Sequence, residues 1–300
     1  MERKSGVLMH ISSLWGDYSC GCFGKAAYEF VDFLCEGGFS YWQVLPFGLV
    51  DECNSPYKSY STFGGNPYFV DLESLYKDEL ITSAELESAK QQTPYSCEFD
   101  RLSKERVNLL ITASQRVSQD LKDKINNFID SNKHLADFCK FMALKSANNN
   151  TEWIDWTVEA FSPVDEFGWR FIQYEFFTQW ARVKEYANSK GIKIIGDIPI
   201  YVALDSADVW AEPEWFQLDE KNVPVEVAGV PPDYFSVDGQ LWGNPLYNWD
   251  AMHKDGYGWW IRRIDGAAKL YDVIRIDHFR GLEAYWAVPY GDETAKNGRW

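Results

Sequence analysis

Gly6-Val7-Leu8-Met9-His10 opens the chain with a short apolar run, which is typical of a buried strand. Residues 25–36 follow with apolar side chains at helical spacing, and Gly37-Gly38 marks the end of that helix. Tyr41-Trp42-Gln43-Val44-Leu45 is a second buried-strand candidate, and Pro46 ends it. A strand, a helix and a strand in this order predict a β-α-β unit and therefore a parallel sheet.

The same alternation returns in the second half of the chain. Aromatic residues at helical spacing predict a long amphipathic helix over residues 163–189. Residues 193–198 are a third strand candidate, 257–271 a helix, and 272–277 a fourth strand. Strands and helices that alternate, with long loops after the strands, predict an α/β fold, namely a (β/α)₈ TIM barrel with helical and loop insertions. A doubly wound sheet is the alternative, but the sequence has no glycine-rich phosphate loop of the GxGxxG or Walker A type.

The chain divides into three predicted regions. Residues 1–74 start the barrel, and residues 161–300 continue it. Residues 75–160 are rich in Lys and Glu and poor in Gly and Pro, which predicts a helical insertion, with a separate helical domain as the alternative. Residues 211–250 form a loop-rich stretch with many Pro, Gly, Trp and Tyr residues. A loop of that length inside a compact domain is uncommon and is usually functional.

Charge and composition narrow the classes of ligand. The 300 residues include 29 Lys and Arg against 45 Asp and Glu, for a net charge of −16. An acidic chain has no general attraction to phosphate backbones or anionic membranes, so we expect no nucleic-acid or membrane partner. Aromatic residues make up 17% of the chain, which suits neutral polar ligands with apolar faces, such as sugars. Buried core aromatics are the alternative interpretation of that excess.

The cysteines indicate a reducing, cytoplasmic setting. The six of them are too sparse for a disulfide framework and include no CxxC pair. A zinc site from Cys20, Cys22 and Cys53 would lack the usual closed spacing of four ligands. The N-terminus makes a poor signal peptide, and no apolar run approaches the length of a membrane helix. We therefore expect a cytoplasmic protein with no metal and no organic cofactor.

Polar residues cluster where the predicted strands end. Asp197 closes the third strand, and Arg275 and Asp277 lie near the end of the fourth. Because side chains two residues apart share a face of a strand, Arg275 would lie beside Asp277 and keep its carboxylate ionised. Such a carboxylate can act as a nucleophile or stabilise a developing cation, and an ordinary salt bridge is the alternative. His278, taken by itself, is more typical of a core or rim histidine.

The loop at residues 229–245 offers both stacking faces and hydrogen-bonding groups. Trp242, Tyr234 and Phe235 could pack on the apolar faces of pyranose rings, while Asp233 could bind their hydroxyl groups. The alternative is a structural loop pinned by its aromatic residues.

Motifs along nearly the whole chain resemble the 4-α-glucanotransferases of the amylomaltase type, glycoside hydrolase family 77 of the α-amylase clan. The resemblance is weakest over residues 75–160. It rests on these stretches, in this order: GVLMHISSL, YWQVLPFG followed by NSPYKSYSTFGGNPYFVDL, GDIPIYVALDSADVW, VAGVPPDYFSVDGQLWGNPLYNWD and VIRIDHFRG.

The resemblance implies a role for each candidate residue. It makes Asp277 the nucleophile and Arg275 the residue that positions it, with Trp242 stacking on the acceptor side. Other residues are implied to bind substrate, namely Tyr57 and Asp197 at the cleavage subsite, His278 beside the nucleophile, and Asp233, Tyr234 and Phe235 on a covering loop. The implied reaction retains anomeric configuration and passes an α-1,4-glucan from a covalent aspartyl intermediate to a sugar 4-hydroxyl. The implied partners are maltooligosaccharides or glucans derived from starch or glycogen.

One part of the family pattern is missing from this sequence. The family's general acid/base glutamate lies on the strand after the nucleophile, and the sequence stops at Trp300 before it; Glu283 follows Asp277 too closely to be that acid. With only four barrel strands counted, we expect a barrel truncated after about the fourth strand. We expect the 300-residue chain by itself to be inactive and poorly soluble, because half a barrel leaves unpaired edges. An α-glucan hydrolase of the same clan and a non-catalytic glucan-binding protein are the alternative functions.

Overall fold

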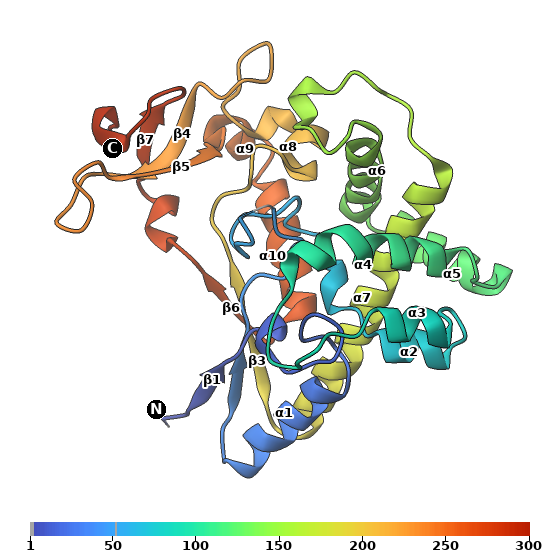
Figure 1. Cartoon of the computed structure of the whole chain (residues 1–300). Helices are drawn as coiled ribbons and strands as arrows, with labels where there is room; N and C mark the ends of the chain where they lie inside the picture. Colours follow the sequence, from blue (N-terminus) through green and yellow to red (C-terminus); the bar gives the residue numbers. More distant parts are fainter. Residues whose placement is uncertain (1–2, 52) are drawn as a thin grey trace.

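The four predicted strands form one parallel sheet. The computed structural model describes residues 3–51 and 53–300, and its sheet has the strand order β1-β2-β3-β6. The strands span Gly6–Leu8 (β1), Tyr41–Gln43 (β2), Lys193–Ile198 (β3) and Val273–Ile276 (β6). Figure 1 shows this sheet beside the N-terminus. The α/β class is thus confirmed, whereas a closed barrel and its truncation stay predictions, since the parallel sheet of the described residues has four strands.

Three helices connect successive strands of this sheet, as the alternation predicts. They span Lys25–Glu36 (α1), Pro163–Ser189 (α7) and Gly258–Leu270 (α10). The Ser162 side chain caps α7 and Pro163 follows at the first turn, where a missing N–H costs nothing. The predicted aromatic face of α7 is partly correct: Phe171 is fully buried, but Ala181 is exposed. The buried stripe runs instead through residues such as Phe176 and Trp180.

The region predicted as a helical insertion is helical throughout most of its length. Its helices span Leu72–Lys77 (α2), Ser83–Ser88 (α3), Phe99–Ser114 (α4), Gln119–Asp130 (α5) and Lys133–Ala147 (α6). In Figure 1 they gather around α7, with α6 next to α8 (Ala207–Ala211) at the top of the view. Leu110 and Phe138 from this region share one hydrophobic cluster with Trp42 and Ile194 of the parallel sheet. The shared core favours an insertion over a separate helical domain, although the division into three regions stays a prediction.

The loop-rich stretch contains regular structure that the sequence pattern did not predict. Two of its segments pair with each other, and one of them also pairs with a later strand, in an antiparallel sheet of order β5-β4-β7. The elements of this part span Ala207–Ala211 (α8), Glu226–Val230 (β4), Gln240–Pro245 (β5), Trp249–Lys254 (α9) and Trp286–Pro289 (β7). Most of β5 is exposed or half-buried and includes Gly243, so it shows no apolar run. Short 3₁₀ turns elsewhere cover Ile11–Ser13, Pro67–Phe69, Trp153–Asp155, Pro213–Trp215, Phe279–Leu282 and Ala295–Asn297.

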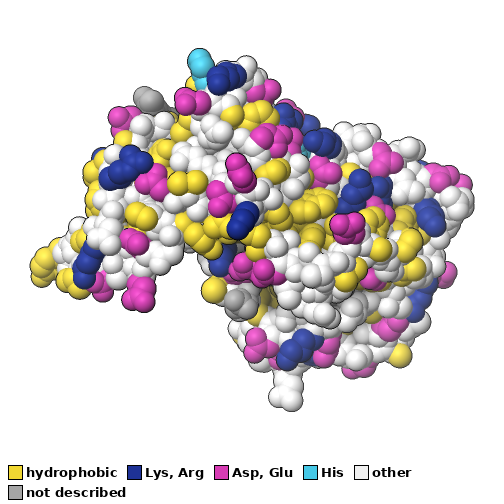
Figure 2. Space-filling model, turned by 90° about the horizontal axis from the view of Figure 1, so that it is seen from above, with side chains coloured by type: hydrophobic (Ala, Val, Ile, Leu, Met, Phe, Trp, Pro, Cys, Tyr) yellow, Lys and Arg dark blue, Asp and Glu magenta, His cyan; other side chains and the backbone are white. Residues whose placement is uncertain are grey.

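Acidic side chains are spread diffusely over the face of the molecule that Figure 2 shows. Lys and Arg side chains lie between them, and apolar side chains run across the middle of that face. Among the described residues, no helix is both long and apolar enough to cross a bilayer.

His10, at the carboxyl end of β1, makes the free energy of unfolding depend on pH. Its side chain is 8% exposed, its Nδ1 accepts the Leu45 N–H at 3.3 Å, and its ring packs edge-on against Phe69. Burial lowers the pKa of His10 to about 4, because desolvation penalises the charged imidazolium. The folded state therefore favours neutral His10. Its contribution to stability is complete above the unfolded pKa of about 6.5 and is lost as the pH falls through about 4.

We expect His10 to account for about 3 kcal/mol of acid destabilisation between pH 6.5 and pH 4. In His10→Asn, the amide oxygen can still accept from Leu45, but the side chain no longer titrates. Urea unfolding of both proteins across this pH range measures the effect. The wild-type free energy of unfolding should fall more steeply with acid than that of the variant, and parallel curves would refute the assignment.

Candidate active site

The residues at the centre of the candidate site are brought together by the register between β3 and β6. Asp197 on β3 pairs in register with Arg275 on β6, so both side chains point to the same side of the sheet. Asp277 lies two residues beyond Arg275, and its N–H extends the ladder by donating to Ile198 O at 2.9 Å. All three residues therefore meet at the carboxyl ends of adjacent parallel strands, which is where α/β folds place ligand sites.

Arg275 bridges the two carboxylates. Its Nη1 donates to Asp197 Oδ2 and its Nη2 to Asp277 Oδ1, both at 2.5 Å. The Asp197 side chain is fully buried, while 45% of Arg275 and 39% of Asp277 remain exposed. Partial burial acts to lower the pKa of Arg275, but the two neighbouring carboxylates outweigh it and raise that pKa. The predicted contact between Arg275 and Asp277 is present, and the second contact, to Asp197, is an addition.

Tyr57 joins this network from a loop far away in the sequence. Its hydroxyl donates to Asp197 Oδ2 at 2.7 Å. Burial and this hydrogen bond raise the pKa of Tyr57 to about 12, so the hydroxyl keeps its proton and stays a donor near neutral pH. The other Asp197 oxygen, Oδ1, is buried and has no partner among the described residues.

His278 and Trp242 lie together on the other side of Asp277. The strand ends before His278, whose φ of 50° is left-handed, so its side chain does not follow the strand alternation. The His278 ring packs edge-on against Trp242 of β5, with ring centroids 5.1 Å apart. Burial lowers the pKa of His278 more than the Asp277 carboxylate raises it, so the ring stays neutral near pH 7. Its buried Nε2 has no partner among the described residues.

The residues of the predicted covering loop form the tip of the hairpin between β4 and β5. Asp233 Oδ1 accepts the N–H groups of Phe235 and Ser236, which shapes the turn. Tyr234 is 95% exposed and Phe235 is 92% exposed, and their rings pack edge-on against each other. Within the described part of the chain, no hydrogen bond, ion pair or ring contact connects these three residues to Asp277.

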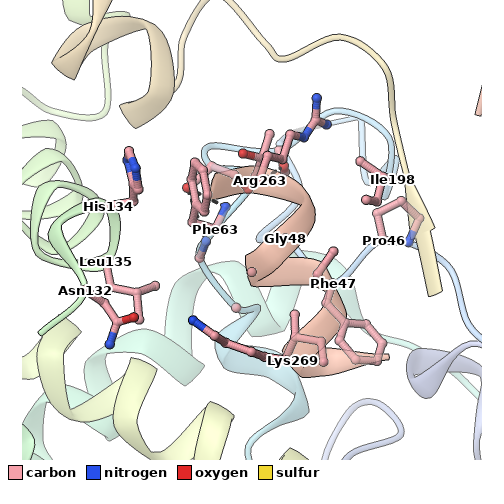
Figure 3. A pocket seen from close by; sticks show the side chains of 18 of the residues that line it. Pro46, Phe47, Gly48, Phe63, Asn132, His134, Leu135, Ile198, Arg263 and Lys269 are labelled. Atoms are coloured by element: carbon pink, nitrogen blue, oxygen red, sulfur yellow. Dashed lines mark hydrogen bonds between the residues drawn. The ribbon is translucent and has the colours of Figure 1, made fainter. Parts of the chain in front are cut away.

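A cavity of about 750 Å³ extends from Tyr57 and Asp197 toward the helical insertion. Figure 3 shows that aromatic and aliphatic side chains, including Phe63 and Leu135, line it together with polar groups such as His134. The His134 ring stacks on Phe63, with centroids 4.2 Å apart, and its Nε2 accepts from Arg262 Nε. This contact joins α6 to α10 across the cavity.

Comparison with known proteins places the chain in a family. The model of the 4-alpha-glucanotransferase family, glycoside hydrolase family 77, matches residues 9–300. A 4-alpha-glucanotransferase of Clostridium butyricum is 45% identical over 97% of this chain, and one of Streptococcus pneumoniae is 44% identical over all of it. The chain belongs to the 4-alpha-glucanotransferase family. It spans 63% of the length of both relatives.

Solved structures of 4-alpha-glucanotransferases agree with this assignment. An amylomaltase from Streptococcus agalactiae, solved in complex with acarbose, superposes with a TM-score of 0.95 at 39% identity. The superposition covers all of this chain and 64% of that one. An amylomaltase from Corynebacterium glutamicum, at 18% identity and a TM-score of 0.78, shares the fold.

Two residues that the sequence did not single out support the site. The Tyr201 ring lies within 6.4 Å of both Trp242 and His278, measured between centroids. Arg263 is buried and donates to the main-chain oxygens of Pro199 and Ile200, which follow directly after β3. Tyr201 follows soon after the end of β3, which is a weak signal that it lies near the site. Nothing in the local sequence pattern indicates a role for Arg263. No cluster of three or more metal-binding side chains occurs in residues 3–51 and 53–300.

Proposed function

We propose that the protein containing this chain is a retaining 4-α-glucanotransferase. It would move a segment of an α-1,4-glucan from a donor maltooligosaccharide to the 4-hydroxyl of an acceptor sugar. The observation that carries the proposal is the Asp197–Arg275–Asp277 network at the ends of β3 and β6. Family membership and the 45% identity to a 4-alpha-glucanotransferase support it.

In the first step, Asp277 would act as the nucleophile. Arg275 holds Oδ1, so the attacking atom would be Oδ2, which forms a bond to the anomeric carbon as the bond to the leaving oxygen breaks. The leaving oxygen takes a proton from a carboxylic acid about 5 Å from Asp277, as the retaining scheme requires. Arg275 fixes the orientation and the negative charge of Asp277 before the reaction, which avoids reorganisation during it.

In the second step, the acceptor replaces the leaving group. Its 4-hydroxyl loses a proton to the same carboxylate and attacks the anomeric carbon, which releases Asp277 and restores the starting configuration. Tyr57 and Asp197 would bind the sugar at the cleavage point. Trp242 and His278 would bind the sugars next to it. Asp233, Tyr234 and Phe235 would close over the bound glucan, and excluding water there would favour transfer over hydrolysis.

The four-stranded sheet fits the proposal that this chain belongs to a complete (β/α)₈ barrel. Among the described residues, β1 and β6 each pair on one side only. Such parallel edges are normally covered by further strands. The 64% coverage of the amylomaltase from Streptococcus agalactiae supports the same proposal. We place the reaction in the cytoplasm, because all six cysteines are free thiols.

Maltotriose disproportionation tests the function with two preparations. The protein that contains this chain within a complete barrel should convert maltotriose to glucose and a ladder of longer oligosaccharides. The 300-residue chain alone should give no turnover, because the second carboxylate that Arg275 brings near Asp277 is Asp197, which is fully buried and already bound by Arg275 and Tyr57. Shortened products without a ladder would indicate a hydrolase, binding without any products would indicate a glucan-binding protein, and a ladder from the short chain would refute its inactivity.

A further inference from the structure

A buried arginine without a carboxylate partner lies far from the candidate active site in the sequence. Arg106 of α4 is 4% exposed, and its guanidinium donates to the main-chain oxygens of Tyr18, Tyr68 and Val70. None of the ion pairs of the described residues includes it. A buried cation that is bound only by neutral oxygens attracts any nearby group that can ionise.

The ionisable groups nearest to Arg106 are mostly thiols. Cys20, Cys22 and Cys97 all interact electrostatically with its guanidinium, together with the Asp71 carboxylate that caps α2. Burial raises the pKa of Cys22 to about 12, and its thiol donates to Asp71. The Cys20 thiol donates to the main-chain oxygens of Gly21 and Tyr68. Interaction between the Cys20 and Cys97 thiols raises the pKa of Cys20 and lowers that of Cys97, and Arg106 lowers the pKa of Cys97 further.

Main-chain and side-chain contacts hold together the two chain segments that carry Cys20 and Cys97. The Glu98 N–H donates to Ser19 O at 2.8 Å, and Ser19 Oγ donates to Glu98 Oε2 at 3.0 Å. Cys20 and Cys97 are the chain neighbours of this doubly bonded pair. Cys20 is buried, whereas Cys97 is half-buried and lines a surface hollow with Lys90, Gln91 and Arg101. The Cys97 thiol is therefore reachable from solvent, whereas the Cys20 thiol is buried.

We propose that Cys97 and Cys20 form a reversible redox site, in which Cys97 reacts with a peroxide and Cys20 resolves the product as a disulfide. The Cys97 thiolate attacks one oxygen of the peroxide, which gives a Cys97 sulfenic acid and releases hydroxide or alkoxide. The Cys20 sulfur then attacks the sulfenic sulfur, and its proton leaves with the displaced oxygen as water. Both sulfurs are oxidised, the peroxide is reduced, and a dithiol reductant reverses the bond.

Peptide mapping after oxidation tests this site. The reduced protein containing this chain is treated with hydrogen peroxide, its remaining thiols are blocked by alkylation, and it is digested with trypsin. We expect a cross-link between the tryptic peptides of residues 5–25 and 91–101, which dithiothreitol removes. Because the first peptide holds both Cys20 and Cys22, variants identify the partner. The cross-link should persist in Cys22→Ser and be lost in Cys20→Ser.

The Cys20→Ser variant supplies a second readout. Without its resolving thiol, Cys97 should accumulate as a sulfenic acid that dimedone labels, whereas the wild type should show little label. Cys35 and Cys53 are the matched controls, since both are exposed and neither lies beside Arg106. Oxidation of these two before Cys97, a cross-link that depends on Cys22, or an unlabelled Cys97 in the variant would each overturn the proposal.

Discussion

Asp277→Asn is expected to lower glucan transfer by on the order of 10⁴-fold or more while oligosaccharide binding persists. The amide keeps the shape of the carboxylate, and its oxygen can still accept from Arg275 Nη2. An amide is too weak a nucleophile to form the glycosyl ester, so the covalent route is lost. Turnover of maltotriose in the complete barrel and calorimetric binding of acarbose measure the two effects separately.

The choice of donor sharpens the test of Asp277. A glycosyl fluoride has a leaving group that departs without protonation, so it reacts in enzymes that lack the general acid but not in those that lack the nucleophile. Asp277→Asn should therefore stay inactive with a maltosyl fluoride. Asp265→Asn is the matched control, because it also removes a carboxylate from an ion pair, here the exposed pair with Lys269. Near-normal turnover by Asp277→Asn would show that Asp277 is not the nucleophile.

The sequence predicts the parallel sheet well because its strands contain short apolar runs bounded by turn residues, as Ile194 and Ile195 do in Lys193–Ile198. Burial alone does not separate the two sheets, since β6 is exposed or half-buried and β4 is mostly buried. The antiparallel strands lie in a stretch rich in Gly and Pro, and β5 itself includes Gly243 and Pro245, which hides them from a local reading. The central strand β4 pairs with β5 and with β7, and β7 lies about sixty residues further along the chain, so this pairing cannot be recognised from local periodicity.

The candidate site shows the same division between local and long-range information. Spacing along one strand predicts the contact between Arg275 and Asp277, because side chains two residues apart share a face. The Asp197–Arg275 bridge depends on the register between β3 and β6, which no local pattern reveals. Tyr57 reaches Asp197 from 140 residues away, and only the resemblance to a known family indicated it. The roles of all these residues in catalysis stay predictions.

Arg275→Ala is expected to lower the turnover number for transfer by about 10²- to 10³-fold, with a smaller change in the Michaelis constant. Loss of the guanidinium leaves Asp197 and Asp277 without the cation that bridges them, so the nucleophile loses its fixed orientation. Arg275→Lys should restore little of this activity, because one ammonium group cannot reproduce the planar fork that donates to two carboxylates at once. Steady-state kinetics on maltotriose measures these changes.

Rescue distinguishes this positioning role from a purely structural one. If Arg275 acts through its bridge, added guanidinium ion should occupy the space left in Arg275→Ala and recover part of the lost turnover, at concentrations that leave the wild type unaffected. Arg299→Ala is the matched control, since Arg299 is 73% exposed and pairs with Glu226 on the antiparallel sheet. That variant should keep full activity and gain nothing from guanidinium. Full activity of Arg275→Lys would contradict the bridging role, because charge alone, without the fork, would then sustain the reaction. An equal response of both alanine variants to guanidinium would also contradict it, because the ion would then act elsewhere than in the space left by Arg275.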